Sequence, residues 1–134
     1  MHYPIVYQKE KYDCGPACIC MICEFYQSNT DLVTVCRIAG LSEKGTSIWD
    51  MQRTLRILGF QTASIKMNNF ISDYNFEIPL IAVISKSAGN NHYVVIYKRL
   101  KNGLIIGDPD KGLIKMKITE FLKEFIGYLI IPQK

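Results

Sequence analysis

The sequence predicts an α+β fold in which helices come first and a mostly antiparallel β-sheet follows. The first half of the chain has capping and stop signals for three helices, and in the clearest of them apolar side chains recur at three- and four-residue intervals, the period of an amphipathic helix. From residue 60 onward, short runs rich in β-branched and aromatic residues are separated by turn residues. No stretch rich in Gly or Ser divides the chain. Helices followed by strands without a linker are typical of a single α+β domain, here covering residues 1–134.

The first helix is expected to run from Cys14 to Tyr26. Asp13 stands at the N-cap position, where an acidic side chain commonly accepts a hydrogen bond from the first turn. Pro16 then falls within that turn, where its missing N–H group is tolerated. These signals together place a helix N-terminus at Cys14.

Two further helices are expected before residue 60. In NTDLVTVCRIAGL, Thr30 or Asp31 is the N-cap and Gly40 marks the end of a short helix. In GTSIWDMQRTLRILGF, Ser47 is the expected N-cap and Gly59 follows the last helical residue. The expected apolar face of this third helix consists of Ile48, Met51, Leu55 and Leu58.

The rest of the chain contains stretches typical of β-strands and one short helix. In order, the strands are FQTASIK, IPLIAVIS, HYVVIYKR, GLIIGD, GLIKMKI and GYLIIP, with the helix TEFLKEF before the last of them. HYVVIYKR and GLIIGD are expected to pair as a hairpin. A loop over 98–102 would place His92 opposite Asp108, Val94 opposite Ile106 and Ile96 opposite Leu104. A tighter turn at Asn102-Gly103 would bring Asp108 near Tyr97, so a His92–Asp108 pair requires the longer loop or a bulge.

The composition is that of an ordinary globular domain. Of 134 residues, 49% are apolar and 21% are charged, and the net charge of +4 is too small to indicate a nucleic-acid partner. No apolar run approaches the ~20 residues that a membrane-spanning helix needs. The start, MHYPIVYQKEKY, lacks the apolar core and the cleavage site of a secretory signal.

Four of the five cysteines lie within residues 14–23. A clustered, odd set is unlike a disulfide scaffold and indicates free thiols in a reducing, cytoplasmic environment. At about 100° per residue, Cys14 and Cys18 share one helix face, whereas Cys20 and Cys23 share roughly the opposite face. The four thiols therefore cannot converge on one zinc ion, and no metal ligands are assigned. The residues expected to be small, buried and apolar are Cys18, Cys20, Cys23 and Cys36.

Cys14 differs from the other cysteines because it lies in the first turn of its helix. Free N–H groups and the positive end of the helix dipole favour the thiolate, which is the nucleophilic form. Position alone is equally consistent with a buried structural thiol. A thiolate nucleophile also needs a base and a group that orients the base. His92 is the candidate base, since it opens a strand beside a loop and the other histidine, His2, lies in the terminal segment.

Asp108 is the candidate for the orienting group, because it ends the strand that is expected to pair with the strand of His92. Asp108 and Asp110 are equally typical of the turn sequence DPDKG, and Asp110 is interpreted as a turn residue only. The backbone N–H of Cys14 and the side-chain amide of Gln8 are the candidate donors to a developing oxyanion. Taken by itself, Gln8 has the character of a surface residue near the chain start.

These residues, in this order, resemble the C39 peptidases, which are papain-like cysteine proteases at the N-terminus of bacterial ABC exporters for bacteriocins and quorum-sensing peptides. The resemblance rests on Gln8, on DCGPAC from Asp13, on HYVV from His92 and on Asp108-Pro109, and it covers essentially the whole chain. It implies a papain-like fold in which Cys14 is the nucleophile and His92 the general base and acid. By the same resemblance, Asp108 orients His92 and Gln8 donates to the oxyanion.

The resemblance also implies a substrate. Family members cleave a leader peptide after a double-glycine motif, and they bind this leader as an amphipathic helix in an apolar groove. Apolar residues that suit such a groove, and equally suit the core, are Ile65, Met67, Phe70 and Ile71, so the substrate-binding residues stay unassigned. The expected partners are the precursor peptide and the transmembrane and nucleotide-binding domains of an exporter, and no nucleic acid is expected.

The chain itself has no transmembrane segment and no phosphate-binding loop. It is therefore expected to be a domain excised from the N-terminus of a larger exporter, on the cytoplasmic side of the plasma membrane. The peptidase needs no cofactor, and ATP and Mg²⁺ would belong to the transporter domains. An alternative function is a module that binds the leader and recruits cargo without cutting it. The presence of both Cys14 and His92 favours the enzyme.

Overall fold

The computed structural model describes residues 2–40, 42–67, 78–87 and 90–134. Three helices come first, namely α1 (Cys14–Phe25), α2 (Leu32–Ala39) and α3 (Ile48–Ile57). The elements that follow are β1 (Gln61–Lys66), β2 (Leu80–Ser87), β3 (Asn90–Arg99), β4 (Gly103–Asp108), β5 (Gly112–Lys117), α4 (Ile118–Glu124) and β6 (Phe125–Gln133). The predicted α+β fold, with its helices first, is confirmed.

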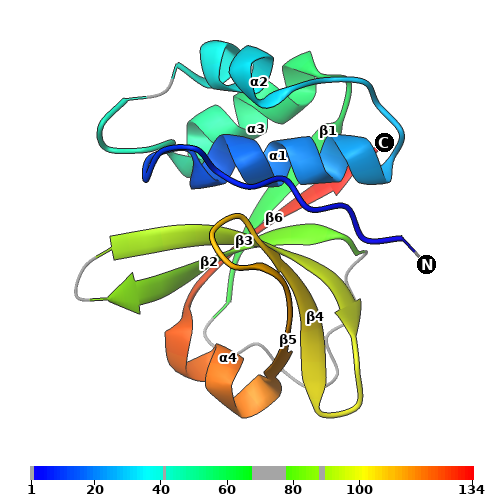
Figure 1. Ribbon diagram of the computed structural model, residues 1–134, viewed down its shortest axis with the longest axis vertical. Coiled ribbons are helices and arrows are strands. Elements are labelled where there is room, and N and C mark those ends of the chain that lie inside the picture. Colours follow the sequence, from blue (N-terminus) through cyan, green and yellow to red (C-terminus); the bar gives the residue numbers. More distant parts are fainter. Residues whose placement is uncertain (1, 41, 68–77, 88–89) are drawn as a thin grey trace.

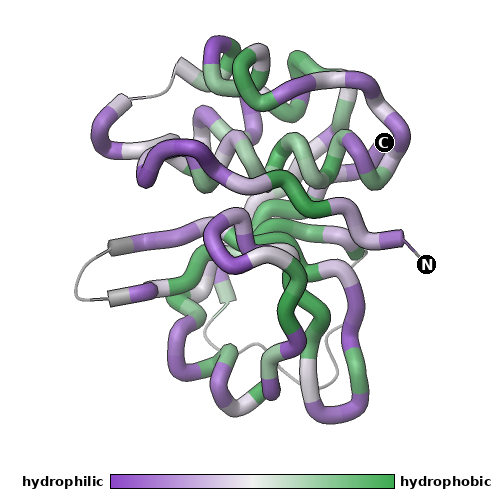
Figure 2. Tube along the Cα trace, viewed as in Figure 1, coloured by the Kyte–Doolittle hydropathy of each residue, from purple (hydrophilic) through white to green (hydrophobic). Residues whose placement is uncertain are grey.

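The strands form one antiparallel sheet in the order β1-β6-β2-β3-β4-β5. Figure 1 shows α1, α2 and α3 as a layer on one side of the sheet and α4 on the other side. The helix α1 contacts both β3 and the other two N-terminal helices, while α4 lies against β2, β4 and β5. The hydrophobic stretches of the chain meet where α1 faces the central strands (Figure 2).

Both faces of the central strands are buried. Alternate residues of β2 and β3 point to opposite faces of the sheet. Those that pack with the helices are Ile81, Val83, Tyr93, Val95 and Tyr97. Those that form a second core with Phe121 of α4 are Leu80, Ala82, Ile84, Val94 and Ile96. Because both faces are covered, the sheet holds the start of β3 in a fixed position relative to α1.

The burial of α1 explains the cysteine cluster. All residues from Cys14 to Cys23 are buried, because α1 lies between the sheet and the other two helices. Cys18, Cys20 and Cys23 are therefore core residues, as predicted, although they lie on different faces of the helix. Cys36 on α2 differs from the prediction, since it is only half-buried.

The predicted caps hold for two of the three helices. Asp31 accepts a hydrogen bond from Thr34 N at 2.8 Å, and Ser47 accepts one from Asp50 N at 3.0 Å. Asp13 occupies the N-cap position of α1 but makes no side-chain bond to that helix. Its carboxylate instead accepts from the backbone N–H groups of residues 9 and 10, at 3.1 and 2.8 Å. Asp13 thus fastens the segment before α1 to the helix start.

The hairpin of β3 and β4 contains a bulge, which was one of the two expected ways to form a His92–Asp108 pair, but neither of the two registers predicted for a regular hairpin is present. Ile96 pairs with Ile106, where the longer loop would have paired it with Leu104. Pairing then slips by one residue at Tyr97, which bulges from β3. Near the start of β3 the register is offset by two residues from the predicted one. A shift of two keeps the same side chains on one face, so the predicted His–Asp pair is diagonal rather than directly opposite.

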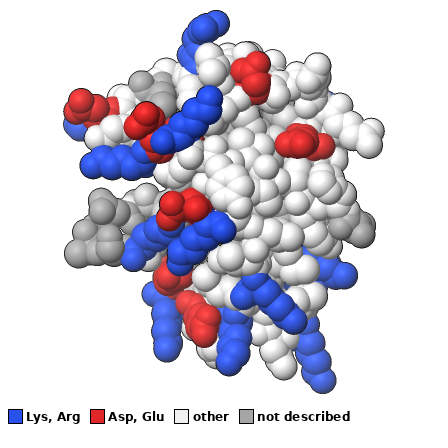
Figure 3. Space-filling view, in the orientation of Figure 1, with Lys and Arg blue, Asp and Glu red and all other residues white. Residues whose placement is uncertain are grey.

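The net positive charge of the protein comes from the sheet-forming half of the chain. Residues 1–60 contain six Lys or Arg and six Asp or Glu, so the whole excess of +4 lies in residues 61–134. Figure 3 shows both signs over the helical layer and over the sheet side, with Lys and Arg predominating over the sheet side. Among the described residues, no helix has both the length and the apolar character needed to cross a membrane.

Candidate active site

Cys14 is the first residue of α1, at the end where backbone N–H groups lack partners within the helix. The partial positive charge of the helix dipole at this end stabilises a thiolate. The next residue is packed closely: a Cβ added at Gly15 would lie 2.7 Å from Sδ of Met51. Cys14 is 8% exposed, so its sulfur has limited contact with solvent at the start of a buried, rigid helix.

The structure brings His92 and Asp108 to Cys14, as predicted. His92 Nε2 lies 2.8 Å from Asp108 Oδ1, and the imidazole also shares a hydrogen bond with the Cys14 thiol. Because Nε2 is engaged by the carboxylate, Nδ1 is the ring nitrogen left to face the sulfur. His92 is 5% exposed and Asp108 is 2% exposed. The three side chains come from α1, β3 and β4. The pairing of β3 with β4 brings His92 to Asp108, and the packing of α1 on the sheet adds Cys14.

Burial and charge shift the pKa values of His92 and Asp108 in opposite directions. Burial by itself would lower the pKa of His92, but the hydrogen bonds and charges of Asp108 and Cys14 raise it to about 9. Burial would raise the pKa of Asp108, yet hydrogen bonds from His92 and from the N–H of Asp110, together with the nearby positive charges, lower it. At neutral pH the site therefore favours an imidazolium against a carboxylate.

Gln8 lies beside the end of β4. Its backbone N–H donates to the carbonyl of Pro109 at 2.9 Å, which ties residue 8 to the residue after Asp108. The side-chain nitrogen donates to the carbonyl of Glu10 at 2.9 Å. The side-chain oxygen is buried and has no hydrogen-bond partner among the described residues. An amide nitrogen carries two hydrogens, so one donor of Gln8 stays available beyond the bond to Glu10.

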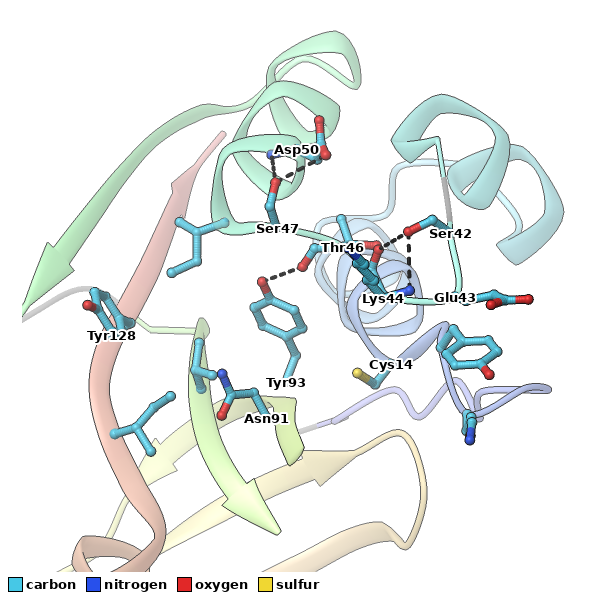
Figure 4. A pocket seen from close by; sticks show the side chains of 16 residues that line it. Cys14, Ser42, Glu43, Lys44, Thr46, Ser47, Asp50, Asn91, Tyr93 and Tyr128 are labelled. Carbon is cyan, nitrogen blue, oxygen red and sulfur yellow. Dashed lines mark hydrogen bonds between the residues drawn. The ribbon is translucent and has the colours of Figure 1, made fainter. Parts of the chain in front are cut away.

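Cys14 opens onto a cleft of about 750 Å³ between the helical layer and the sheet. One wall is the loop 42–47, and the opposite side comes from β2, β3 and β6. Figure 4 shows the sulfur of Cys14 pointing into this space, on the side of Tyr93 and Asn91. The charged residues of the lining are Lys11, Glu43, Lys44 and Asp50, so the two signs balance.

The cleft wall depends on a hydrogen bond that sequence reasoning missed. The buried hydroxyl of Tyr93, next to His92 in β3, donates to the backbone carbonyl of Thr46 at 2.7 Å (Figure 4). This bond fastens the loop 42–47 to the strand that carries the candidate base. The sequence held no signal for it, because an apolar-patterned strand gives no indication of which backbone carbonyl a tyrosine will reach.

The structure corrects the interpretation of Asp110 as a turn residue only. Its backbone N–H donates to Asp108 Oδ1 at 2.8 Å, and its side chain pairs with Lys86 Nζ at 2.5 Å. Lys86 also lies 3.9 Å from Asp108 Oδ2. Neither contact was predicted, because the position of Lys86 depends on a strand irregularity that the sequence does not mark.

The remaining cysteines have no comparable environment. Burial, together with neighbouring thiols and acidic groups, raises the pKa of Cys18 well above its usual value and that of Cys20 to about 12. Burial raises the pKa of Cys23 to about 11. All five cysteines are free thiols. Within the described residues, no three His, Cys, Asp or Glu side chains are arranged to hold a metal ion.

Of the residues suggested for a leader-binding groove, Ile65 and Met67 are half-buried against the second core, and Phe70 and Ile71 lie outside the described residues.

The whole chain is similar to known proteins. The model of the peptidase C39 family matches residues 2–134. The chain is 35% identical over 130 residues to the lactococcin-G-processing and transport ATP-binding protein of Lactococcus lactis subsp. lactis. That match covers 96% of this chain but only 18% of the relative, so the chain spans less than a fifth of that protein's length.

Two solved structures have the same architecture. The peptidase domain of Streptococcus ComA, a bifunctional ABC transporter of a quorum-sensing pathway, superposes with a TM-score of 0.92 at 32% identity and 98% coverage of both chains. A double-glycine-motif protease from an AMS/PCAT transporter, solved in complex with the leader peptide, superposes with a TM-score of 0.88 at 25% identity. The match covers 96% of this chain and 89% of that one.

Proposed function

Because the chain belongs to the peptidase C39 family, we propose that it cleaves the leader peptide of a precursor after a double-glycine motif, with Cys14 as the nucleophile. The observation that carries the proposal is the buried line of hydrogen bonds from Cys14 through His92 to Asp108, which opens onto the cleft. A thiol, an imidazole and a carboxylate in this sequence are the parts of a nucleophile, a base and an orienting group.

In the first half of the reaction, the proton of the Cys14 thiol has already passed to His92, which is an imidazolium, and the thiolate attacks the carbonyl carbon of the second glycine. The new C–S bond displaces an electron pair onto the carbonyl oxygen. The backbone N–H of Cys14 and the side-chain amide of Gln8 donate to that oxyanion. The imidazolium of His92 then gives its proton to the leaving nitrogen, the C–N bond breaks, and the mature peptide departs with a free amine.

In the second half, His92 removes a proton from a water molecule that attacks the thioester. The C–S bond breaks, the leader leaves with a free carboxylate, and the sulfur of Cys14 recovers the proton. Asp108 stays ionised throughout and keeps Nδ1 of His92 directed at the sulfur. This reaction uses side chains, backbone donors and water, and it calls for no cofactor.

The cleft supports a small, uncharged cleavage motif. Its lining carries two basic and two acidic side chains, so a neutral glycine pair meets no net charge. Glycine also lets a substrate backbone approach the sulfur closely, because it has no Cβ. The relatives that the chain matches are processing and transport proteins and are much longer. We therefore infer that the leader is removed in coupling with export, by a larger membrane protein that carries this domain on its cytoplasmic side.

The test is cleavage of a synthetic precursor with an amphipathic leader ending in Gly-Gly. The unchanged chain should release the two halves at the bond after the second glycine, as identified by mass spectrometry. Cys14→Ala should abolish cleavage while still binding the leader, and Cys36→Ala, which removes a thiol outside the site, should cleave normally. Cleavage by Cys14→Ala would remove the assignment of the nucleophile. Leader binding without any cleavage by the unchanged chain would make it a recruiting module.

A further inference from the structure

Lys86 is the one extra residue at a bulge in β2, directly across from the start of β3. Strand β2 pairs with β3 through Ile84 with His92 and Ser85 with Asn91, and the next pair is Ser87 with Asn90. Lys86 therefore has no residue opposite it in β3. A bulge of this kind re-aims the side chain that it inserts. Here it directs a lysine toward the end of β4, where Asp108 lies.

The two oxygens of the Asp108 carboxylate have different neighbours. Oδ1 accepts from His92 Nε2 at 2.8 Å and from the backbone N–H groups of residues 110 and 111, at 2.8 and 3.4 Å. Oδ2 faces Lys86 Nζ at 3.9 Å. Lys86 is held in place by the carboxylate of Asp110, at 2.5 Å. The orienting carboxylate thus lies between an imidazole on one oxygen and an ammonium group on the other.

We propose that Lys86 is a positioning residue, held by its ion pair with Asp110. Its ammonium group offsets part of the negative charge of Asp108, and the imidazole of His92 therefore holds its proton less tightly. This inference rests on the proposed function, because it concerns the base of that reaction. A general base that holds its proton too strongly is slow to return it to the leaving group. A cation beside the far oxygen of Asp108 weakens the attraction between this carboxylate and the imidazolium of His92, and it does so without touching the substrate.

The charged groups around Asp108 determine in which direction Lys86 changes the proton affinity of His92. The groups that face it are Cys18 from α1, Lys86 from β2, His92 from β3 and Asp110 from the turn after β4, and Cys14 faces the other side of His92. Lys86 is the only cation of fixed charge among them. Its side chain is 25% exposed and that of Asp108 is 3% exposed, so solvent screens their interaction less than it screens a surface pair.

The inference makes opposite predictions for its two members. Removing the cation with Lys86→Met leaves the full charge of Asp108 on His92, so the imidazolium form becomes more stable. Removing the anchor with Asp110→Asn deletes a negative charge and frees Lys86 for Asp108, so the imidazolium form becomes less stable. The backbone N–H of residue 110, which bonds to Asp108, is unchanged in that variant.

The experiment is an NMR titration of the His92 ring in a Cys14→Ala background, which leaves Asp108 as the hydrogen-bond partner of the ring. We expect Lys86→Met to raise the pKa of His92 by roughly half a pH unit and Asp110→Asn to lower it by a similar amount. Lys86→Arg, which keeps the charge, should leave it near its original value. The matched control is Lys101→Met, which removes an equal charge at the far end of β3, and His2 is an internal reference in every sample.

Kinetics provide the second measurement. In chains that retain Cys14, Lys86→Met should move the alkaline limb of the kcat/KM profile to higher pH, and Lys86→Arg should not. Equal shifts for Lys86→Met and Lys101→Met, or shifts of the same sign for Lys86→Met and Asp110→Asn, would overturn the inference. The NMR result does not depend on proteolysis. Absence of cleavage in the unchanged chain would therefore contradict the proposed function, whereas an unmoved His92 with normal cleavage would contradict this inference alone.

Discussion

Gln8 shows how a single side chain can gain a role that its sequence neighbourhood hides. It looks like a residue of a polar terminal segment, yet its backbone N–H bonds to Pro109 and its side-chain oxygen is buried. One hydrogen of its amide nitrogen is directed to the carbonyl of Glu10. The other hydrogen is not used in that bond, and we propose that it donates to the oxyanion, as the resemblance to the C39 family implies.

We expect Gln8→Ala to lower kcat by about 10²–10³-fold with little change in KM, the usual loss for one oxyanion donor. Gln8→Glu should be at least as slow, because a carboxylate offers no donor and repels the developing charge. Steady-state kinetics on the double-glycine precursor measure both, and Lys9→Ala, at the exposed neighbouring position, is the control. A normal kcat in Gln8→Ala would exclude Gln8 from the reaction.

Tyr93 carries a second prediction at the scale of one residue. Tyr93→Phe removes only the hydroxyl, which leaves the buried carbonyl of Thr46 without its donor and costs about 1–3 kcal/mol of unfolding free energy. Because that carbonyl belongs to the cleft wall, KM should rise more than kcat falls. Tyr97→Phe is a matched control, since its buried hydroxyl donates to the carbonyl of Pro4 at 2.6 Å, away from the cleft.

Urea unfolding and precursor kinetics together separate the two tyrosines. Both variants should lose comparable stability, and only Tyr93→Phe should lose affinity for the precursor. Equal KM values in the two variants would mean that the loop 42–47 keeps its position without the hydrogen bond.

At the scale of elements, features decided within a few residues, such as helix caps, could be predicted from the sequence. The register in which one strand pairs with another could not. The caps at Asp31 and Ser47 were correct because a cap is decided within four residues. Asp13 also had the right position, but its carboxylate bonds backward to residues 9 and 10, a choice that depends on how the preceding segment folds. A bulge was one of the two arrangements expected to allow the His92–Asp108 pair, and a bulge is present at Tyr97. Its position and the register on either side of it were not predicted, because a bulge has no reliable sequence signal.

The same reasoning explains which parts of the candidate site could be predicted from the sequence. Cys14, His92 and Asp108 each stand at the end of an element, and two of these ends carry marked local sequences, DCGPAC and GDPD. Lys86 sits at a second bulge, between two strands whose exact register is set by the packing of the sheet. Residues positioned by element ends can be predicted, whereas residues positioned by strand irregularities require the structure.

The start of α1 gives a prediction about packing between elements. A Cβ at Gly15 would lie 2.7 Å from Sδ of Met51 and 3.3 Å from side-chain carbons of Thr46 and Tyr93. Gly15→Ala should therefore push α1 away from the cleft wall and cost about 1–3 kcal/mol, in spite of the better helix propensity of alanine. Cleavage should fall with it, because the contacts adjoin Cys14.

Gly40→Ala is the comparison for that variant. Gly40 has a φ of +69° and nothing within 4 Å of an added Cβ, so its substitution strains the end of α2 without crowding the site. Its stability should fall while its kcat/KM stays normal. If Gly15→Ala loses stability but cleaves as well as Gly40→Ala, the packing at Gly15 does not position Cys14.

At the scale of the whole molecule, the buried His92–Asp108 pair links β3 to β4 within the sheet, next to Cys14 of the helical layer, and couples stability to pH. The pKa of His92 is raised from 6.5 to about 9, despite the opposing effect of burial, by its bonds to Asp108 and Cys14. A group with a raised pKa stabilises the folded state fully at pH values below the pKa that it has in the unfolded state. That contribution is lost as pH rises through the pKa that it has in the folded state. The lowered pKa of Asp108 acts in acid, where its contribution disappears as pH falls through the folded value.

We therefore expect the unfolding free energy of Cys14→Ala to fall by about 1–2 kcal/mol as pH rises from 6.5 through the folded pKa of His92. In this background the hydrogen bond and the charge of Asp108 alone raise that pKa, so it lies below the value in the unchanged chain. Urea unfolding at a series of pH values measures the fall, and Cys14→Ala with His92→Gln is the reference. Other buried thiols, such as Cys20 and Cys23, have raised pKa values and weaken both chains alike in alkali, so they cancel in the difference. The difference between the two curves should shrink as pH rises, because only one chain has an imidazolium to lose. Parallel curves would mean that folding leaves the proton affinity of His92 unchanged, and the charge of Asp108 would then not reach the base.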